Sequence, residues 1–73
     1  MLMTEFKIPD KEEFRVREAA RLLGVSHHTI DSAISEGSIQ TAQGHDVLGR
    51  PARWKVILRG ELVRLARQKG LLP

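Results

Sequence analysis

The chain has 73 residues, a formal net charge of +3 and no cysteine. A chain of this length forms one small domain, and the lack of cysteine excludes disulfides and thiolate zinc sites. No apolar stretch approaches the roughly 18 residues that indicate a membrane-spanning helix, and the segment Met1-Leu2-Met3 lacks the apolar region of a signal peptide. We therefore expect a soluble cytoplasmic protein.

Residues 1–13 show neither a helical nor a strand period and contain Pro9. We expect them to form a flexible leader in which Phe6 and Ile8 dock on the domain. Phe14 is then expected to anchor the entrance to the first helix. The domain itself is predicted to span residues 14–70, with residues 71–73 as a tail.

Two short helices joined by a turn are predicted for residues 16–36. The first has apolar residues on one face, at helical spacing: Val16, Ala19, Ala20 and Leu23. Gly24 is typical of a helix end, and Ser26 is a good N-cap for the second helix. The buried stripe of that second helix consists of Ile30, Ala33 and Ile34. This arrangement predicts a helix-turn-helix unit.

A two-stranded hairpin and a third helix are expected after Gly37. Residues 39–42 and 53–56 are predicted to be short strands, and residues 43–52 hold two glycines and a proline, which is typical of a loop. Such a hairpin after a helix-turn-helix is a wing. The last helix is predicted from an apolar stripe and ends at Gly70; the stripe comprises Leu58, Leu62, Leu65 and Ala66.

The charge of the chain is unevenly distributed. From Arg50 onward it holds seven basic residues and one acidic residue, a local charge of +6, whereas the first 49 residues carry a local charge of −3. The basic residues are Arg50, Arg53, Lys55, Arg59, Arg64, Arg67 and Lys69. Such a segment favours a polyanionic partner, although a solvated helix face with ordinary surface arginines has the same composition.

The order helix, turn, helix, two-stranded wing, helix resembles the winged helix-turn-helix module of the MerR and phage-excisionase superfamily. The resemblance spans Phe14 to Gly70 and is most specific in residues 18–26, in Glu36-Gly37 and in residues 53–56. It implies a mainly α fold with a small β-hairpin, in which the second helix enters the major groove and the wing lies over the backbone or minor groove. The chain departs from the family in Arg15, which replaces a Ser or Thr cap, in its long wing loop and in its unusual second helix.

The resemblance implies a non-enzymatic, nucleoid-associated protein that acts in transcription regulation or directs recombination. Its expected partners are double-stranded DNA, further copies of itself on repeated sites, and an integrase or RNA polymerase, with no membrane. A protein-interaction module that uses the second helix without base readout is the alternative. Neither a catalytic constellation nor a cofactor motif is present, and we expect no metal: His27 and Asp31 lie four apart, but two ligands do not make a site.

The candidate DNA-binding residues on the helices are polar or basic. The exposed face of the second helix is expected to carry Ser26, His27, His28, Asp31, Ser32 and Ser35. None is Arg or Lys, so we expect weak base discrimination. The alternative for the two histidines is that they are plain surface residues. Ser26 and Thr29 offer hydroxyls to a phosphate at the helix start. Arg17 and Arg21 lie four apart, where either a phosphate or Glu13 and Glu18 would pair with them.

The wing carries the remaining candidates. Gly49-Arg50-Pro51 with Arg53 is similar to the core of an AT-hook, and a narrow minor groove attracts arginine. We expect Arg50 and Arg53 to contribute more affinity than any side chain of the second helix, and Lys55 beside them is a further candidate for contact with DNA. Trp54 is predicted to pack in the core over Leu62 and Leu65, and the alternative is that it stacks on a sugar or base. Two apolar residues of the loop, Val47 and Leu48, either pack back on the domain or contact a neighbouring protomer.

Overall fold

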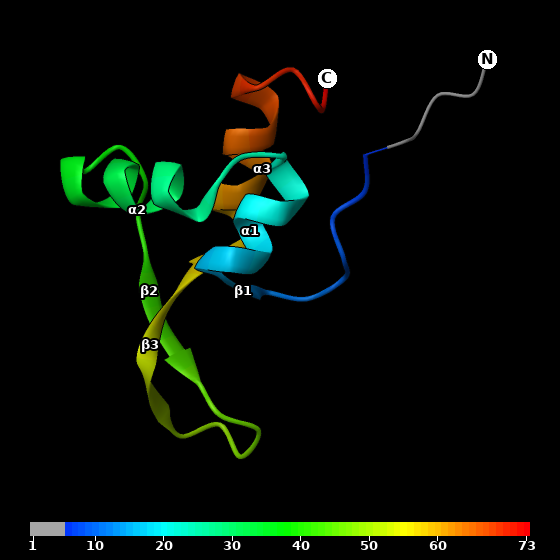
Figure 1. Cartoon of the computed structure of the whole chain (residues 1–73). Helices are drawn as coiled ribbons and strands as arrows, with labels where there is room; N and C mark the ends of the chain where they lie inside the picture. Colours follow the sequence, from blue (N-terminus) through cyan, green and yellow to red (C-terminus); the bar gives the residue numbers. More distant parts are fainter. Residues whose placement is uncertain (1–5) are drawn as a thin grey trace.

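The computed structural model describes residues 6–73 and contains three helices and a three-stranded antiparallel sheet (Figure 1). In chain order the elements are β1 (Glu13–Arg15), α1 (Val16–Leu23), α2 (His27–Glu36), β2 (Ala42–His45), β3 (Pro51–Leu58) and α3 (Arg59–Gln68). Residues 1–5 of the expected leader lie outside this part of the chain. Within residues 6–73, no helix is both long enough and apolar enough to cross a bilayer.

The sheet has the strand order β1-β3-β2, and both pairings are antiparallel. β1 was not predicted, because a three-residue strand is too short to show a period. It pairs Glu13 with Leu58 and Phe14 with Ile57, so the sheet begins at Glu13, the last residue of the expected leader. The prediction of a hairpin is confirmed, but its bounds were wrong: β2 starts at Ala42 rather than at Ile39, and β3 is twice as long as expected.

The caps of the first two helices agree with the prediction. Gly24 ends α1 in the left-handed conformation, with φ of 73°. Ser26 then caps α2, because its hydroxyl accepts the backbone N–H of Thr29 at 3.2 Å. Gly37, with φ of 85°, ends α2. A short turn therefore separates α1 from α2, and α2 projects sideways from the other two helices (Figure 1).

The core lies where α1 packs against α2, α3 and β3. Its largest fully buried side chains are Phe14, Ile57, Leu62 and Val56. Phe6 and Ile8 pack against this core as expected, and so does Leu72 from the tail. Leu58 does not belong to the stripe of the last helix: it precedes α3 as its N-cap and is 44% exposed.

β2 and β3 form a hairpin that extends away from the helices (Figure 1). Residues on its outer half therefore lie beyond the reach of the core. Trp54 is 36% exposed and is not among the side chains packed on the core, so the prediction that it covers Leu62 and Leu65 was wrong. Val47 and Leu48 at the tip are 102% and 70% exposed, so they do not pack back on the domain.

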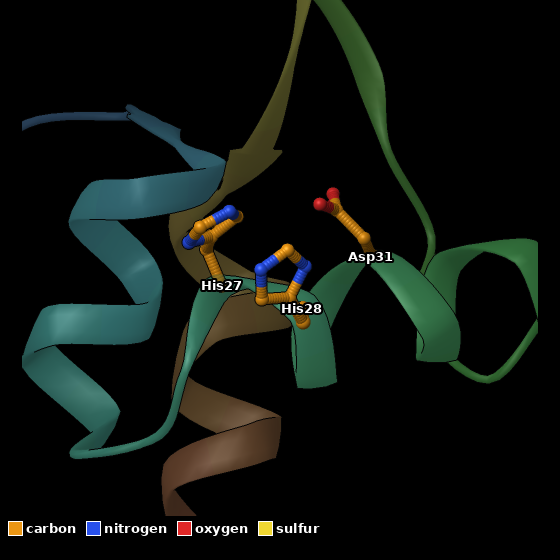
Figure 2. A group of neighbouring side chains, drawn as sticks. All are labelled: His27, His28 and Asp31. Carbon is orange, nitrogen blue, oxygen red and sulfur yellow. The ribbon is translucent and has the colours of Figure 1, made fainter.

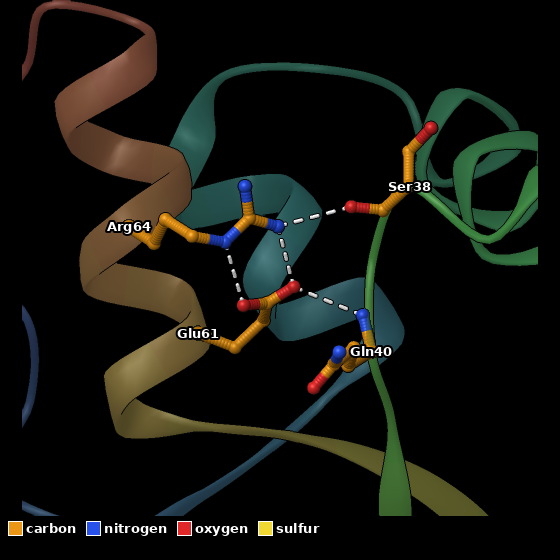
Figure 3. Close-up of polar contacts among 4 residues, drawn as sticks. All are labelled: Ser38, Gln40, Glu61 and Arg64. Atoms are coloured by element: carbon orange, nitrogen blue, oxygen red, sulfur yellow. Dashed lines mark hydrogen bonds and ion pairs between the residues drawn. The ribbon is translucent and has the colours of Figure 1, made fainter.

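A polar cluster ties α3 to the segment between α2 and β2 (Figure 3). The Arg64 guanidinium donates to both carboxylate oxygens of Glu61, at 2.8 and 2.6 Å, and to the carbonyl of Ser38 at 3.0 Å. Glu61 also accepts the backbone N–H of Gln40 at 2.9 Å. The Arg64 guanidinium, helped by the Gln40 N–H, holds the pKa of Glu61 below its ordinary value. Arg64 therefore serves the fold rather than a free cationic surface.

Candidate nucleic-acid interface

An open concavity of about 560 Å³ lies beside the start of α2. Its walls come from three other places in the chain: the end of β1, the first turn of α1 and the middle of β3. The lining residues are Arg15, Val16, Arg17, His27, Asp31, Trp54 and Lys55. We call this concavity the basic cleft, because three of its side chains are permanently cationic at neutral pH and only one is acidic.

One wall of the basic cleft is a stack of three layers. The Arg15 guanidinium lies 4.3 Å from the centre of the Trp54 ring, a cation–π distance. The indole in turn lies over Gly44 of β2: a Cβ built at Gly44 would be 2.3 Å from the indole nitrogen. The register of β2 against β3 shifts between Gln43 and His45, on either side of this glycine. The stack fixes an arginine and an aromatic ring at the edge of the cleft.

The first turns of α1 supply further cations. Arg17 and Arg21 are exposed, and the expected acidic partners are engaged elsewhere: Glu13 bonds His45 at 2.8 Å, and Glu18 pairs with Lys11 at 2.7 Å. Among residues 6–73 neither Arg17 nor Arg21 has an acidic partner. Arg17 lines the basic cleft, whereas Arg21 does not. The charge of Arg17 is therefore available to an anion.

The exposed face of α2 carries His27, His28 and Asp31 side by side (Figure 2). The two imidazole rings have centroids 4.1 Å apart and are tilted by 35°. Ser26 and Thr29 are used locally, because their hydroxyls lie 3.0 Å apart and Ser26 also caps the helix. Thr29 faces a different depression, lined by apolar residues such as Val25 and Leu65. The predicted site residues of α2 thus divide between two sides of the helix.

The tip of the hairpin is a turn organised by Asp46. Its carboxylate accepts the backbone N–H groups of Arg50 and Leu48, at 3.0 and 2.9 Å, and pairs with the Arg50 side chain at 3.0 Å. The N–H of Arg50 is the main reason that the pKa of Asp46 is lowered. Gly49 provides the positive φ, 80°, that the turn needs. Arg50 is therefore held at the tip by an internal carboxylate.

The basic C-terminal third does not form one surface. Arg64 is tied to Glu61, and the Arg59 guanidinium donates to the carbonyls of Pro9 and Lys11. The last turn of α3, with Arg67, lies at the opposite end of the molecule from the hairpin tip (Figure 1). Of the basic residues from 50 to 69, Lys55 alone lines the cleft beside the start of α2, and the others are spread over separate surfaces.

Of the predicted site residues, the basic cleft brings together Arg17, His27, Asp31 and Lys55. Arg53 does not line this cleft; it lines a shallow surface on the hairpin. Ser32 and Ser35 are exposed on α2 outside the cleft. The prediction missed Arg15, and it considered Trp54 at the interface only as the alternative to a place in the core. For Arg15 a signal was present, since an arginine stands where a small capping residue is usual, but its meaning depends on β1.

Comparisons of the chain with protein-family models, with curated proteins and with solved structures find no match. The candidate site therefore rests on the chain's own geometry. That geometry offers cationic and aromatic groups converging beside an exposed helix, which suits the binding of an extended anion.

Proposed function

We propose that the chain is a winged helix-turn-helix protein that binds double-stranded DNA, of the MerR and excisionase-like kind. The order of elements supports this proposal: two helices joined by a capped turn, a protruding β2–β3 hairpin, and a third helix behind them. In this arrangement α2 is the recognition helix and the hairpin is the wing. The family resemblance of the sequence points the same way.

The observation that carries the proposal is the convergence of Arg15, Arg17 and Lys55 on the cleft beside the start of α2. These residues come from β1, α1 and β3, so the fold rather than the local sequence brings their charges together. Phosphates that follow one DNA strand past α2 would meet all three. Cationic contacts to phosphates position a protein on the duplex and supply most of its salt-dependent affinity.

Base readout is expected to be weak. The exposed face of α2 has no Arg or Lys, and Asp31 would repel a nearby phosphate while accepting a bond only from a base amino group. That Arg50 and Arg53 contribute more to duplex affinity than His28 stays a prediction. For Arg50 it requires that the guanidinium leave its ion pair with Asp46. One domain covers one half-site, so we propose several copies on repeated sites, acting in transcription regulation or in directing recombination.

Fluorescence anisotropy with a pool of short duplexes tests the proposal. The logarithm of the association constant should fall linearly with the logarithm of salt concentration, by about 0.9 per neutralised phosphate. Arg17→Ala and Lys55→Ala should each reduce the magnitude of this slope by about 0.9. If variant and wild type bind DNA equally at 1 M salt, the variant should then bind roughly eightfold more weakly at 0.1 M salt.

Arg67→Ala is the matched control. Arg67 is an exposed arginine on the last turn of α3, remote from the wing, and its removal should leave the slope nearly unchanged. Equal losses from Arg17→Ala and Arg67→Ala would refute the assignment of the basic cleft. No binding of any duplex at low salt would refute DNA binding itself and favour a protein-interaction module.

A further inference from the structure

Three side chains of types that ligate metal ions in proteins gather on the exposed face of α2: His27, His28 and Asp31 (Figure 2). Each offers one ligand atom, and these atoms all lie within 4.8 Å of one another. Asp31 is four residues after His27 and three after His28, and both spacings place side chains on the same face of a helix. A rigid helical turn, rather than a loop, therefore sets the arrangement.

These three side chains are also uncommitted. Within residues 6–73, none of them makes a hydrogen bond or an ion pair with another residue. The contrast with His45 is direct, because the Nδ1 atom of that residue lies 2.8 Å from a carboxylate oxygen of Glu13. Two neighbouring imidazoles and a carboxylate without internal partners leave their lone pairs open to a ligand.

We propose that His27, His28 and Asp31 bind a divalent transition-metal cation of the zinc class. The sequence alone counted His27 and Asp31 and set aside a site of two ligands; the structure adds His28 as the third. Two imidazoles and one carboxylate suit Zn²⁺, Ni²⁺, Cu²⁺ or Fe²⁺, whereas Mg²⁺ and Ca²⁺ prefer oxygen ligands. Three protein ligands leave coordination positions open for water or for an external ligand.

Binding requires a small adjustment of the side chains. Metal–nitrogen bonds of about 2.0–2.1 Å bring neighbouring ligand atoms to roughly 3.4 Å in a tetrahedral site. His28 and Asp31 are exposed and His27 is half-buried, so rotation about their side-chain bonds meets little resistance. Arg15, Arg17 and Lys55 line the cleft that His27 and Asp31 share, and their charges weaken the attraction for a cation.

The site is tested on the tag-free full chain without any DNA. Calorimetric titration with Zn²⁺ should give one site per chain, and Co²⁺ should develop visible d–d absorption bands that Zn²⁺ abolishes.

Asp31→Asn and His28→Gln change exposed residues and should preserve the far-ultraviolet circular dichroism spectrum. Each should weaken Zn²⁺ binding by at least tenfold. Loss of a residue that only positions a metal ligand lowers metal affinity roughly 10–100-fold, and loss of a ligand itself costs no less. The matched control is His45→Gln, which should retain wild-type affinity.

Absence of saturable Zn²⁺ binding to the wild type, or equal affinity in wild type and His28→Gln, would overturn the proposal. Because the titration contains no duplex, its failure would leave the DNA-binding proposal intact. Loss of duplex binding would equally leave the metal site standing.

Discussion

Gly44 supports the position of Trp54, and replacing it tests the stacked wall of the basic cleft. A Cβ at residue 44 would lie 2.3 Å from the indole nitrogen and 2.4 Å from the neighbouring ring carbon, far inside ordinary contact. The backbone of Gly44 is not in the left-handed region, so alanine is otherwise compatible with this position. Gly44→Ala therefore acts mainly through the indole, with a lesser contact of 3.1 Å to the backbone carbonyl oxygen of Trp54.

The expected effect reverses sign with the residue at position 54. With Trp54 present, the indole must move by about 1 Å or more and loses its packing on β2 and on Arg15. Overpacking of this kind and loss of a cation–π contact cost about 1–2 kcal/mol together. In a Trp54→Ala background the clash with the indole is gone, and the remaining 3.1 Å contact with the carbonyl oxygen of residue 54 offsets only part of the about 0.5–1 kcal/mol by which alanine in a strand is more stable than glycine. The strand preference is present in both backgrounds and cancels, so the coupling between the two sites equals the cost of the clash, about 1–2 kcal/mol.

A double-mutant cycle measured by thermal or urea unfolding gives this coupling directly. For a domain of this size, 1 kcal/mol shifts the melting temperature by about 4–8 °C, so Gly44→Ala should lower it in the wild type and raise it in Trp54→Ala. Trp54 is the only tryptophan, and its fluorescence should report greater exposure in Gly44→Ala. Equal changes in both backgrounds would refute the proposed contact.

Two further predictions concern the polar clusters. Glu61→Gln should lower the free energy of unfolding by about 1 kcal/mol at pH 7. Because the pKa of Glu61 is lowered in the folded state, its contribution is present above the ordinary value of 4.5 and is lost as the pH falls, so wild type and variant should converge in acid unfolding curves. Asp46→Asn should keep the turn, since an amide oxygen still accepts backbone N–H groups, while releasing the Arg50 side chain. Duplex affinity should then rise by up to about eightfold at 0.1 M salt, and a gain no larger than that of the exposed Asp10→Asn would contradict this reasoning.

The helix pair could be predicted because its signals are local. The left-handed glycines at 24 and 37 and the hydroxyl of Ser26 act on backbone groups within a few residues. The sheet could not be predicted in the same way. β1 exists because Phe14 pairs with Ile57, which is distant in the sequence, and no pattern within residues 13–15 predicts this pairing. The start of β2 likewise depends on its register with β3.

The charges of the candidate site could not be predicted from local sequence either. Counting basic residues predicted a cationic C-terminal third, but Arg59 and Arg64 use their guanidinium groups on backbone carbonyls and on Glu61. Arg17 was predicted as a phosphate ligand with acidic residues as competitors, and the structure engages those residues elsewhere. Which arginines remain available for an anion is decided by tertiary contacts, and composition alone does not contain that information.

The two proposals bear on each other through Asp31. In the basic cleft this carboxylate opposes the entry of a phosphate beside Arg15, Arg17 and Lys55. A divalent cation held by Asp31, His27 and His28 adds two positive charges beside that carboxylate and so replaces the repulsion of a phosphate by attraction. This effect is reciprocal: if a bound metal ion raises the affinity for the duplex by some factor, a bound duplex raises the affinity for the metal ion by the same factor. Without a metal ion, the carboxylate of Asp31 in an otherwise basic cleft argues against DNA binding. With one, Asp31 is the residue through which the metal ion would control DNA binding.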